Sequence, residues 1–248
     1  MFHEYLYKPL FNALIFLYEN VSFGDMGIAI ILLTIFVRVI LFPIFYKSIK
    51  NQTLMQKLQP ALQKIQHDHK HDKEKQARAT MELYKQHKVN PFSSIFLLLA
   101  QLPVLFALLQ VFNNFYKLPL EELVKDLYGF LSRPEIINFQ FLNLIDLKSS
   151  SMLIVVLAAI AQYFQGKLAL PKQNKDEKNG ALSANLTKQM VFIGPLISLM
   201  ILWSLPAAIG IYWLTSSIFS VVQQIYINKK IAKEEESDPL LKQAGIKY

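Results

Sequence analysis

The feature that most constrains this chain is a run of 40 residues, Gln189 to Asn228, that contains no charged side chain. A helix rises about 1.5 Å per residue, so the run would be roughly 60 Å long, whereas the hydrocarbon core of a bilayer is about 30 Å thick. The run is therefore long enough to cross a membrane twice. A Ser-Leu-Pro sequence at 204–206 predicts the tight turn between two spans, at 189–204 and 207–228.

Three further apolar runs have the length of a membrane span. They are 26–46, 91–116 and 149–166, and the first contains a single charge, Arg38. Hydrophobic residues make up 53% of the chain and charged residues 18%, against roughly 25% charged in soluble domains. We therefore expect an all-α integral membrane protein with five transmembrane helices.

The segments between these runs are more polar. Residues 1–25 carry apolar side chains at helical spacing, which predicts an extracytoplasmic helix lying in the membrane interface. Residues 47–90 hold ten basic and four acidic side chains. An apolar stripe within them predicts a helical hairpin in water that bends at 67–73. The remaining segments are a loop with a short interfacial helix at 117–148, a linker at 167–188 and a tail at 229–248.

The distribution of Lys and Arg predicts the orientation. The hairpin, the linker and the tail would share one side of the membrane and together hold 20 basic residues. The N-terminal helix and the 117–148 loop would share the other side and hold five. Because cytoplasmic loops are enriched in Lys and Arg, we expect the hairpin and the C-terminus in the cytoplasm and the N-terminus outside. This asymmetry accounts for most of the net charge of +8 without a specific nucleic acid partner.

Arg38 is the one charged side chain within a predicted span. A charge at the centre of a membrane helix costs roughly 2.5–3.5 kcal/mol on insertion scales, and such residues usually face a bundle interior or a water-filled cavity. Arg38 lies eight residues before Tyr46, about 12 Å from the expected cytoplasmic end. A long side chain at that depth can also extend toward the headgroups. The sequence leaves both interpretations open.

Uncharged polar side chains lie in the other predicted spans, among them Gln101, Gln165 and Ser216. Such groups face protein or water rather than lipid, and helix–helix hydrogen bonding is the simplest role for each of them. Trp213 lies seven residues past Pro206, roughly 10 Å deep by helix rise. That depth does not fit an aromatic belt, so Trp213 is either a packing residue or part of a working surface.

The sequence shows no catalytic constellation. It contains no cysteine, no phosphate-binding Gly-rich loop and no HExxH motif, and no acidic or histidine side chain lies within a predicted span. His67, His69 and His71 alternate on a polar stretch, where histidines are more often solvated than bound to a metal. We therefore predict no metal, no cofactor and no enzymatic activity.

Several ordered motifs resemble the YidC/Oxa family of membrane protein insertases. The first span reads TIFVRVILFPI, the hairpin reads MQKLQPALQKIQ, and ELYKQHKVNP leads into the second span. That span continues LLLAQLPVLFALLQVF, and the last span reads LPAAIGIYWLTSSIFSVVQQ. The resemblance covers nearly the whole chain, from about residue 1 to 230. It is to bacterial members of short form, without a large periplasmic domain.

The resemblance implies a five-helix core around a hydrophilic groove that opens to the cytoplasm and to lipid. The family's groove arginine matches Arg38, and its groove glutamine and tryptophan match Gln165 and Trp213. Gln101 and Ser216 are further groove candidates. The hairpin, with Lys57, Pro60 and Lys64, matches the family's mobile cytoplasmic hairpin.

The implied function is insertion and folding of nascent membrane proteins in the bacterial inner membrane, without nucleotide hydrolysis. The implied partners are the Sec translocon, the ribosome or a targeting receptor, and membrane lipids. Single-span substrates with acidic outer tails fit the fixed positive charge of Arg38.

Two other classes of protein remain as alternatives. A small polytopic transporter or channel would show paired ionisable groups at mid-membrane or inverted repeats. A membrane enzyme such as a lipid transferase would need a base or a metal cluster on a cytoplasmic loop.

Overall fold

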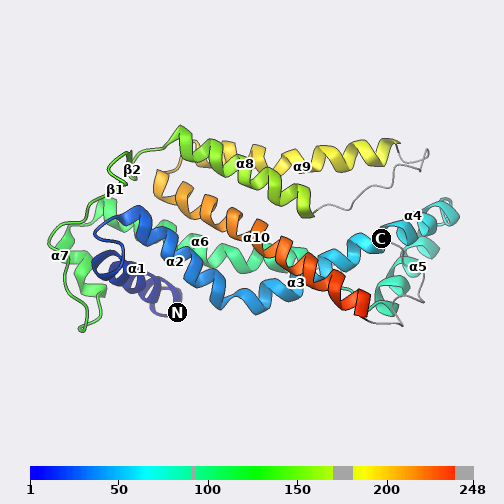
Figure 1. Ribbon diagram of the computed structural model, residues 1–248, viewed down its shortest axis with the longest axis horizontal. Coiled ribbons are helices and arrows are strands. Elements are labelled where there is room, and N and C mark those ends of the chain that lie inside the picture. Colours follow the sequence, from blue (N-terminus) through cyan, green and yellow to red (C-terminus); the bar gives the residue numbers. More distant parts are fainter. Residues whose placement is uncertain (91–92, 170–180, 238–248) are drawn as a thin grey trace.

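The structure is a computed structural model that describes residues 1–90, 93–169 and 181–237. It is an elongated bundle of helices (Figure 1). In chain order the elements are η1 (His3–Tyr7), α1 (Lys8–Asn20), α2 (Met26–Ile40), α3 (Phe42–Lys57), α4 (Gln59–Asp68), α5 (Lys73–Gln86), α6 (Ser93–Lys117), α7 (Leu120–Leu123), η2 (Val124–Asp126), β1 (Gln140–Phe141), β2 (Ile145–Asp146), α8 (Met152–Ala169), α9 (Ala181–Leu202) and α10 (Ala207–Ser237).

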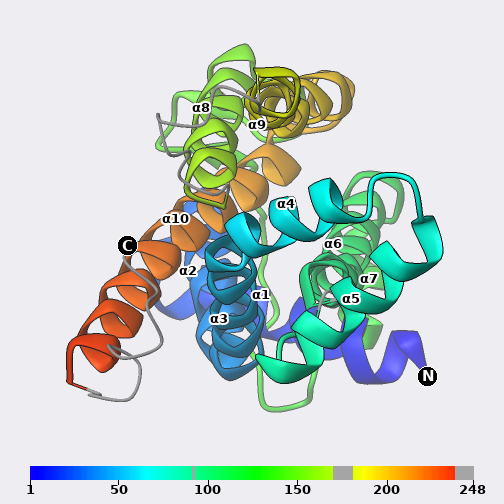
Figure 2. The same cartoon turned by 90° about the vertical axis from the view of Figure 1, so that its right-hand side faces the viewer.

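The helices form two groups that meet along α10. Helix α8 packs between α9 and α10, while α10 also contacts α2, α3 and α6. Figures 1 and 2 show the α8–α9 pair on one side of α10, with α2, α3 and α6 on the other side. The α4–α5 hairpin projects from one end of the bundle, and α1, α7 and the β1–β2 pair lie at the opposite end (Figure 1).

Length and hydropathy identify candidate membrane spans among the described residues. The segments Met152–Ala169 and Ala207–Lys233 are each long and apolar enough to cross a bilayer. The pair Met26–Ile40 and Phe42–Lys57 passes the same test together, although it is bent by 68°. Apart from one pair of two-residue strands, the regular structure within 1–90, 93–169 and 181–237 is helical, as expected for an α-helical membrane protein.

The segment predicted as one span, 26–46, is divided between two helices. Helix α2 ends at Ile40, and α3 begins at Phe42 with Pro43 in its first turn. A proline in the first turn of a helix loses no hydrogen bond, but it could not continue α2, because it has no N–H to donate to the carbonyl of Val39. Pro43 therefore ends α2 inside the predicted span 26–46.

The predicted hairpin starts later than expected. Residues 47–57 continue α3, so the two arms are α4 and α5, and the turn between them falls at 69–72, inside the predicted bend. The carboxylate of Asp72 caps α5 by accepting a 3.0 Å hydrogen bond from the backbone amide of Lys75.

Other helix bounds also differ from the prediction. Helix α9 begins at Ala181, within the predicted linker, and α10 continues to Ser237, within the predicted tail, because 229–237 is rich in good helix formers. The interfacial helix expected in 117–148 is confined to the short α7 and η2, and the strands β1 and β2 were not predicted. The start of the predicted span 91–116 lies outside the described residues, as do parts of the predicted linker and tail.

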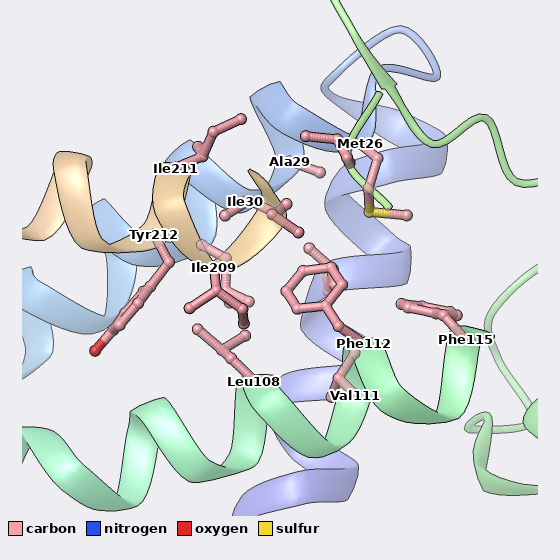
Figure 3. Packing of buried hydrophobic residues seen from close by; sticks show 14 of the residues in the cluster. Met26, Ala29, Ile30, Leu108, Val111, Phe112, Phe115, Ile209, Ile211 and Tyr212 are labelled. Carbon is pink, nitrogen blue, oxygen red and sulfur yellow. The ribbon is translucent and has the colours of Figure 1, made fainter. Parts of the chain in front are cut away.

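The N-terminal helix is part of the core. Its side chains Tyr7, Phe11, Leu14 and Ile15 are at most 2% exposed. They pack in one hydrophobic cluster with side chains of α2, α6 and α10. Figure 3 shows that cluster where Ile30 and Ile209 meet Leu108, Val111 and Phe112 of α6. The predicted interfacial helix is therefore also a packed helix that fixes α2 against α6.

Candidate functional site

Arg38 lies in the last turn of α2, next to the bend, and is only 4% exposed. The bend brings Phe45 of α3 back toward the guanidinium, whose Cζ lies 4.6 Å from the centre of the ring. A cation over an aromatic face is stabilised by the quadrupole of the ring. Burial within the bundle, rather than extension to the headgroups, is thus the arrangement that the structure shows for Arg38.

The guanidinium joins three helices through hydrogen bonds. Its Nε donates to Ser216 Oγ of α10 at 2.9 Å, and its Nη2 donates to the same hydroxyl. Nη2 also donates to Gln101 Oε1 of α6 at 3.3 Å, and Gln101 Nε2 lies 3.5 Å from Ser216 Oγ. The structure therefore brings together three of the predicted groove residues. We call Arg38, Gln101 and Ser216 the arginine cluster.

A small cavity lies beside the arginine cluster. Its volume of about 10 Å³ is close to the space that one water molecule needs. Nη1 of Arg38 is buried and has no hydrogen-bond partner among the described residues. The side chains that line the cavity come from α2, α3, α6 and α10: Thr34, Val37, Arg38, Leu41, Phe45, Gln101, Val104 and Tyr212. A cavity of this size is much smaller than the open groove that the resemblance implies.

Two members of this site were missed in the sequence. Tyr212 is 3% exposed, and its hydroxyl interacts with the side chains of Gln101 and Ser216. It lies one turn before Ser216 and hence on the same helix face, so spacing alone could have indicated it. Phe45 had no sequence signal, because its position over Arg38 depends on the bend at Leu41.

The other two predicted groove residues lie elsewhere. Among the described side chains, neither Gln165 nor Trp213 lines the cavity. Trp213 shares a helix face with Ser217, whose hydroxyl accepts a 3.4 Å hydrogen bond from Gln162 Nε2 of α8. Trp213 is half-buried against the main hydrophobic cluster. Trp213 Nε1 and Gln165 Oε1 are both buried without a partner in the described part of the chain.

A second polar contact joins α3 to α10 between the arginine cluster and the hairpin. Thr53 Oγ1 of α3 donates to Asn228 Oδ1 of α10 at 3.0 Å, and Gln224 Nε2 donates to the same oxygen at 3.2 Å. Next to it Ile49, Ile227 and Ile231 form a small apolar cluster. We call these six residues the α3–α10 junction. While it is formed, it holds α3 against α10.

The predicted hairpin residues do not meet the arginine cluster. Lys57 is the half-buried last residue of α3, whereas Pro60 and Lys64 are exposed on α4. In the described residues no group of three or more His, Asp or Glu side chains could hold a metal ion.

Comparison with known proteins identifies the family to which the chain belongs. The model of the 60Kd inner membrane protein family matches residues 16–235. The chain belongs to the YidC/Oxa family. A relative from Fusobacterium nucleatum, named membrane protein insertase YidC, is 34% identical over 229 residues, which are 92% of this chain and 98% of that protein.

YidC/Oxa relatives of different lengths match most of this chain. A protein of the same name from Clostridium tetani is 32% identical over 212 residues, 86% of this chain and 85% of the relative. One from Geobacter metallireducens is 30% identical over 233 residues, 93% of this chain but only 38% of the relative. The chain thus spans less than half of the Geobacter protein and nearly all of the Fusobacterium protein. The resemblance drawn from the motifs is confirmed.

Proposed function

We propose that this chain is a membrane protein insertase that places apolar segments of nascent proteins into the bilayer. The similarity to proteins named membrane protein insertase YidC carries the proposal. A buried arginine whose hydrogen bonds all go to neutral groups supports it, because such a charge can attract an acidic segment of a substrate.

The proposed topology has five spans in the bacterial inner membrane. Helices α2 with the start of α3, α6, α8, α9 and α10 would cross it, and the α4–α5 hairpin and the C-terminus would lie in the cytoplasm. The excess of Lys and Arg on that side supports this orientation. The N-terminal helix and the 117–148 loop, which pack together through Asn12 and Asp126, would then lie outside.

Insertion would begin with separation of α3 from α10. Opening the α3–α10 junction would extend the cavity into a hydrophilic groove leading from the cytoplasm to Arg38. An acidic tail of a single-span substrate would then meet a positive charge in surroundings of low dielectric, where attraction is stronger than in water. Gln101 and Ser216 would hold the guanidinium in place, and Gln165 and Trp213 would contact the substrate from the α8–α10 side.

The substrate itself would supply the free energy. Transfer of an apolar segment of about 20 residues from water into lipid is strongly favourable. The membrane potential adds about 2.3 kcal/mol per charge per 100 mV for an acidic tail that moves outward. Insertion would therefore need no nucleotide.

The partners would lie mostly on the cytoplasmic side. Lys57 at the end of α3, and Pro60 and Lys64 on the α4–α5 hairpin, would meet anionic headgroups, the ribosome or a targeting receptor. The Sec translocon would be a lateral partner in the membrane. Specific nucleic acid binding is not part of the proposal.

Liposomes that contain only the purified protein test the proposal. A single-span substrate with an acidic outer tail is added without nucleotide, and protease protection of that tail is compared with empty liposomes. Protection well above the empty liposomes is expected. If protection does not exceed that background, autonomous insertion is excluded, and solute flux through the same liposomes would test the transporter alternative.

A further inference from the structure

Two tight turns at the end of the bundle opposite the hairpin carry exposed apolar side chains on strained backbone. Phe23, in the turn before α2, is 100% exposed and has a φ of 54°. In the turn between β1 and β2, Leu142 is 54% exposed with a φ of 53°, and Leu144 is 84% exposed. A bulky side chain at positive φ costs free energy and persists only where its surroundings hold it.

Asp25 holds the two turns next to each other. Its Oδ1 accepts a 2.9 Å hydrogen bond from the amide of Ile28, and its Oδ2 accepts a 2.6 Å hydrogen bond from the amide of Leu142. Strand β1 also packs against α2. Phe23, Leu142 and Leu144 therefore protrude from one region, and we call them the apolar tip. Neighbouring exposed apolar side chains mark a contact with something outside the chain.

The polar groups around the apolar tip suit lipid better than a protein partner. Residues 20–24 and 139–145 contain no Asp, Glu, Lys or Arg, and the carboxylate that joins the turns is occupied by two backbone amides. The amides of Gly24 and Leu144 donate to carbonyls within the same turns at 3.2 and 3.0 Å. A protein interface uses about one hydrogen bond per 100–200 Å², whereas lipid requires backbone groups to be paired internally.

The length of α2 also favours lipid at the level of the apolar tip. Helix α2 has 15 residues and is therefore about 22 Å long, against about 30 Å for the hydrocarbon core. Helix α3 departs from the axis of α2 by 68° and adds little to this height. Phe23 immediately precedes α2, and α8 starts at the same end with the exposed side chains Met152 and Leu153 (Figure 1). Apolar residues beyond the start of α2 would complete the match to the bilayer.

We infer that the apolar tip inserts into the outer leaflet of the membrane and anchors the start of α2 and the β1–β2 turn among lipid chains. Transfer of the three exposed side chains from water into lipid offsets the cost of the strained backbone. The inference rests on the proposed topology, which places these turns outside, and not on insertase activity. The tip would fix the height of α2 in the bilayer.

Spin labels test the depth of the apolar tip, because the chain contains no cysteine and a single introduced cysteine is labelled specifically. Full-length Phe23→Cys and Leu144→Cys, with Arg133→Cys as an exposed control in the same outer loop, carry a nitroxide. Each is placed in lipid nanodiscs that hold one chain. Power saturation then compares collisions with oxygen, which concentrates in lipid, and with a water-soluble nickel complex. Labels at 23 and 144 should collide mainly with oxygen and lose access to nickel, whereas the label at 133 should show the reverse.

Because each nanodisc holds one chain, a second copy cannot cause the shielding. Labels at 23 and 144 that reach nickel as readily as the label at 133 would overturn the inference, since the bilayer would then thin to α2 alone or the tip would await a protein partner. Shielding at only one of the two positions would overturn a shared anchor. Asp25→Ala should increase the mobility of the label at 144 and leave the label at 133 unchanged. Failure of the liposome insertion assay would leave the lipid contact standing.

Discussion

Replacing Ser216 by alanine removes the main acceptor of the buried arginine. Ser216 Oγ accepts hydrogen bonds from both Nε and Nη2 of Arg38, and Ser216 is only 1% exposed. Hydrogen bonds to charged groups contribute about 1.5–3 kcal/mol each, and leaving a buried charged donor without its acceptor costs at least as much. Because Gln101 remains bonded to Nη2, we expect Ser216→Ala to lower the free energy of unfolding by about 2–3 kcal/mol.

The neighbouring serine provides a matched control. Ser217 is equally buried, but its hydroxyl accepts a single 3.4 Å bond from the neutral amide of Gln162. A neutral bond contributes about 0.5–1.5 kcal/mol, and a long one falls at the low end. Ser217→Ala should therefore cost at least about 1 kcal/mol less than Ser216→Ala.

A double-mutant cycle measures the interaction directly. Wild type, Arg38→Gln, Ser216→Ala and the double variant are unfolded reversibly in bicelles. Residues that share a hydrogen-bond network show coupling of about 0.5–3 kcal/mol, and we expect the upper half of that range. Coupling below about 0.5 kcal/mol, or equal costs for the two serine variants, would show that Ser216 is not the main acceptor of Arg38.

Three further predictions concern the rest of the fold. Gly27→Ala would place a Cβ 2.3 Å from Cδ2 of Phe141 and should destabilise by about 1–3 kcal/mol; thermal unfolding should show recovery when Phe141→Ala is added, and a more stable Gly27→Ala would contradict the packing. Asn228→Ala removes the acceptor of Thr53 and should speed amide hydrogen exchange in α3 and α10 at the α3–α10 junction but not in α1. Unchanged exchange would show that the junction does not hold α3 against α10. Burial raises the pKa of Tyr7 above its ordinary 10.0. The contribution of neutral Tyr7 to the free energy of unfolding is therefore fully present below pH 10 and is lost as pH rises through the raised pKa. Tyr7→Phe should flatten this fall when the free energy of unfolding is measured against pH, and an unchanged slope would contradict the raised pKa.

Membrane-scale features could be predicted because they depend on length and charge. The uncharged run 189–228 predicted two helices joined at 204–206, and the structure places the break between Leu202 and Ala207. The isolation of Arg38 in an apolar run singled out the residue around which the cavity forms.

Features that depend on three-dimensional packing could not be predicted. The first predicted span bends by 68° at Leu41. Its apolar sequence favours one continuous helix, whereas Pro43 has no N–H for the hydrogen bond that such a helix would need. That bend carries Phe45 to Arg38. The contact between Thr53 and Asn228 joins residues far apart in the sequence, and no local pattern links them. Likewise, the carboxylate of Asp25 caps α2 and accepts from the amide of Leu142 in the distant loop.

Crosslinking to a substrate in transit tests most directly whether the arginine cluster is the path of insertion. A photoreactive residue replaces Gln101, which faces Arg38, or Phe106, which lies on the same helix and is 55% exposed toward the bundle's surroundings. The chain is reconstituted with a stalled single-span substrate that carries an acidic outer tail. Position 101 should crosslink to the tail, this crosslink should be lost in Arg38→Gln, and position 106 should not crosslink to the tail. Tail crosslinks from position 106 without any from position 101 would contradict it.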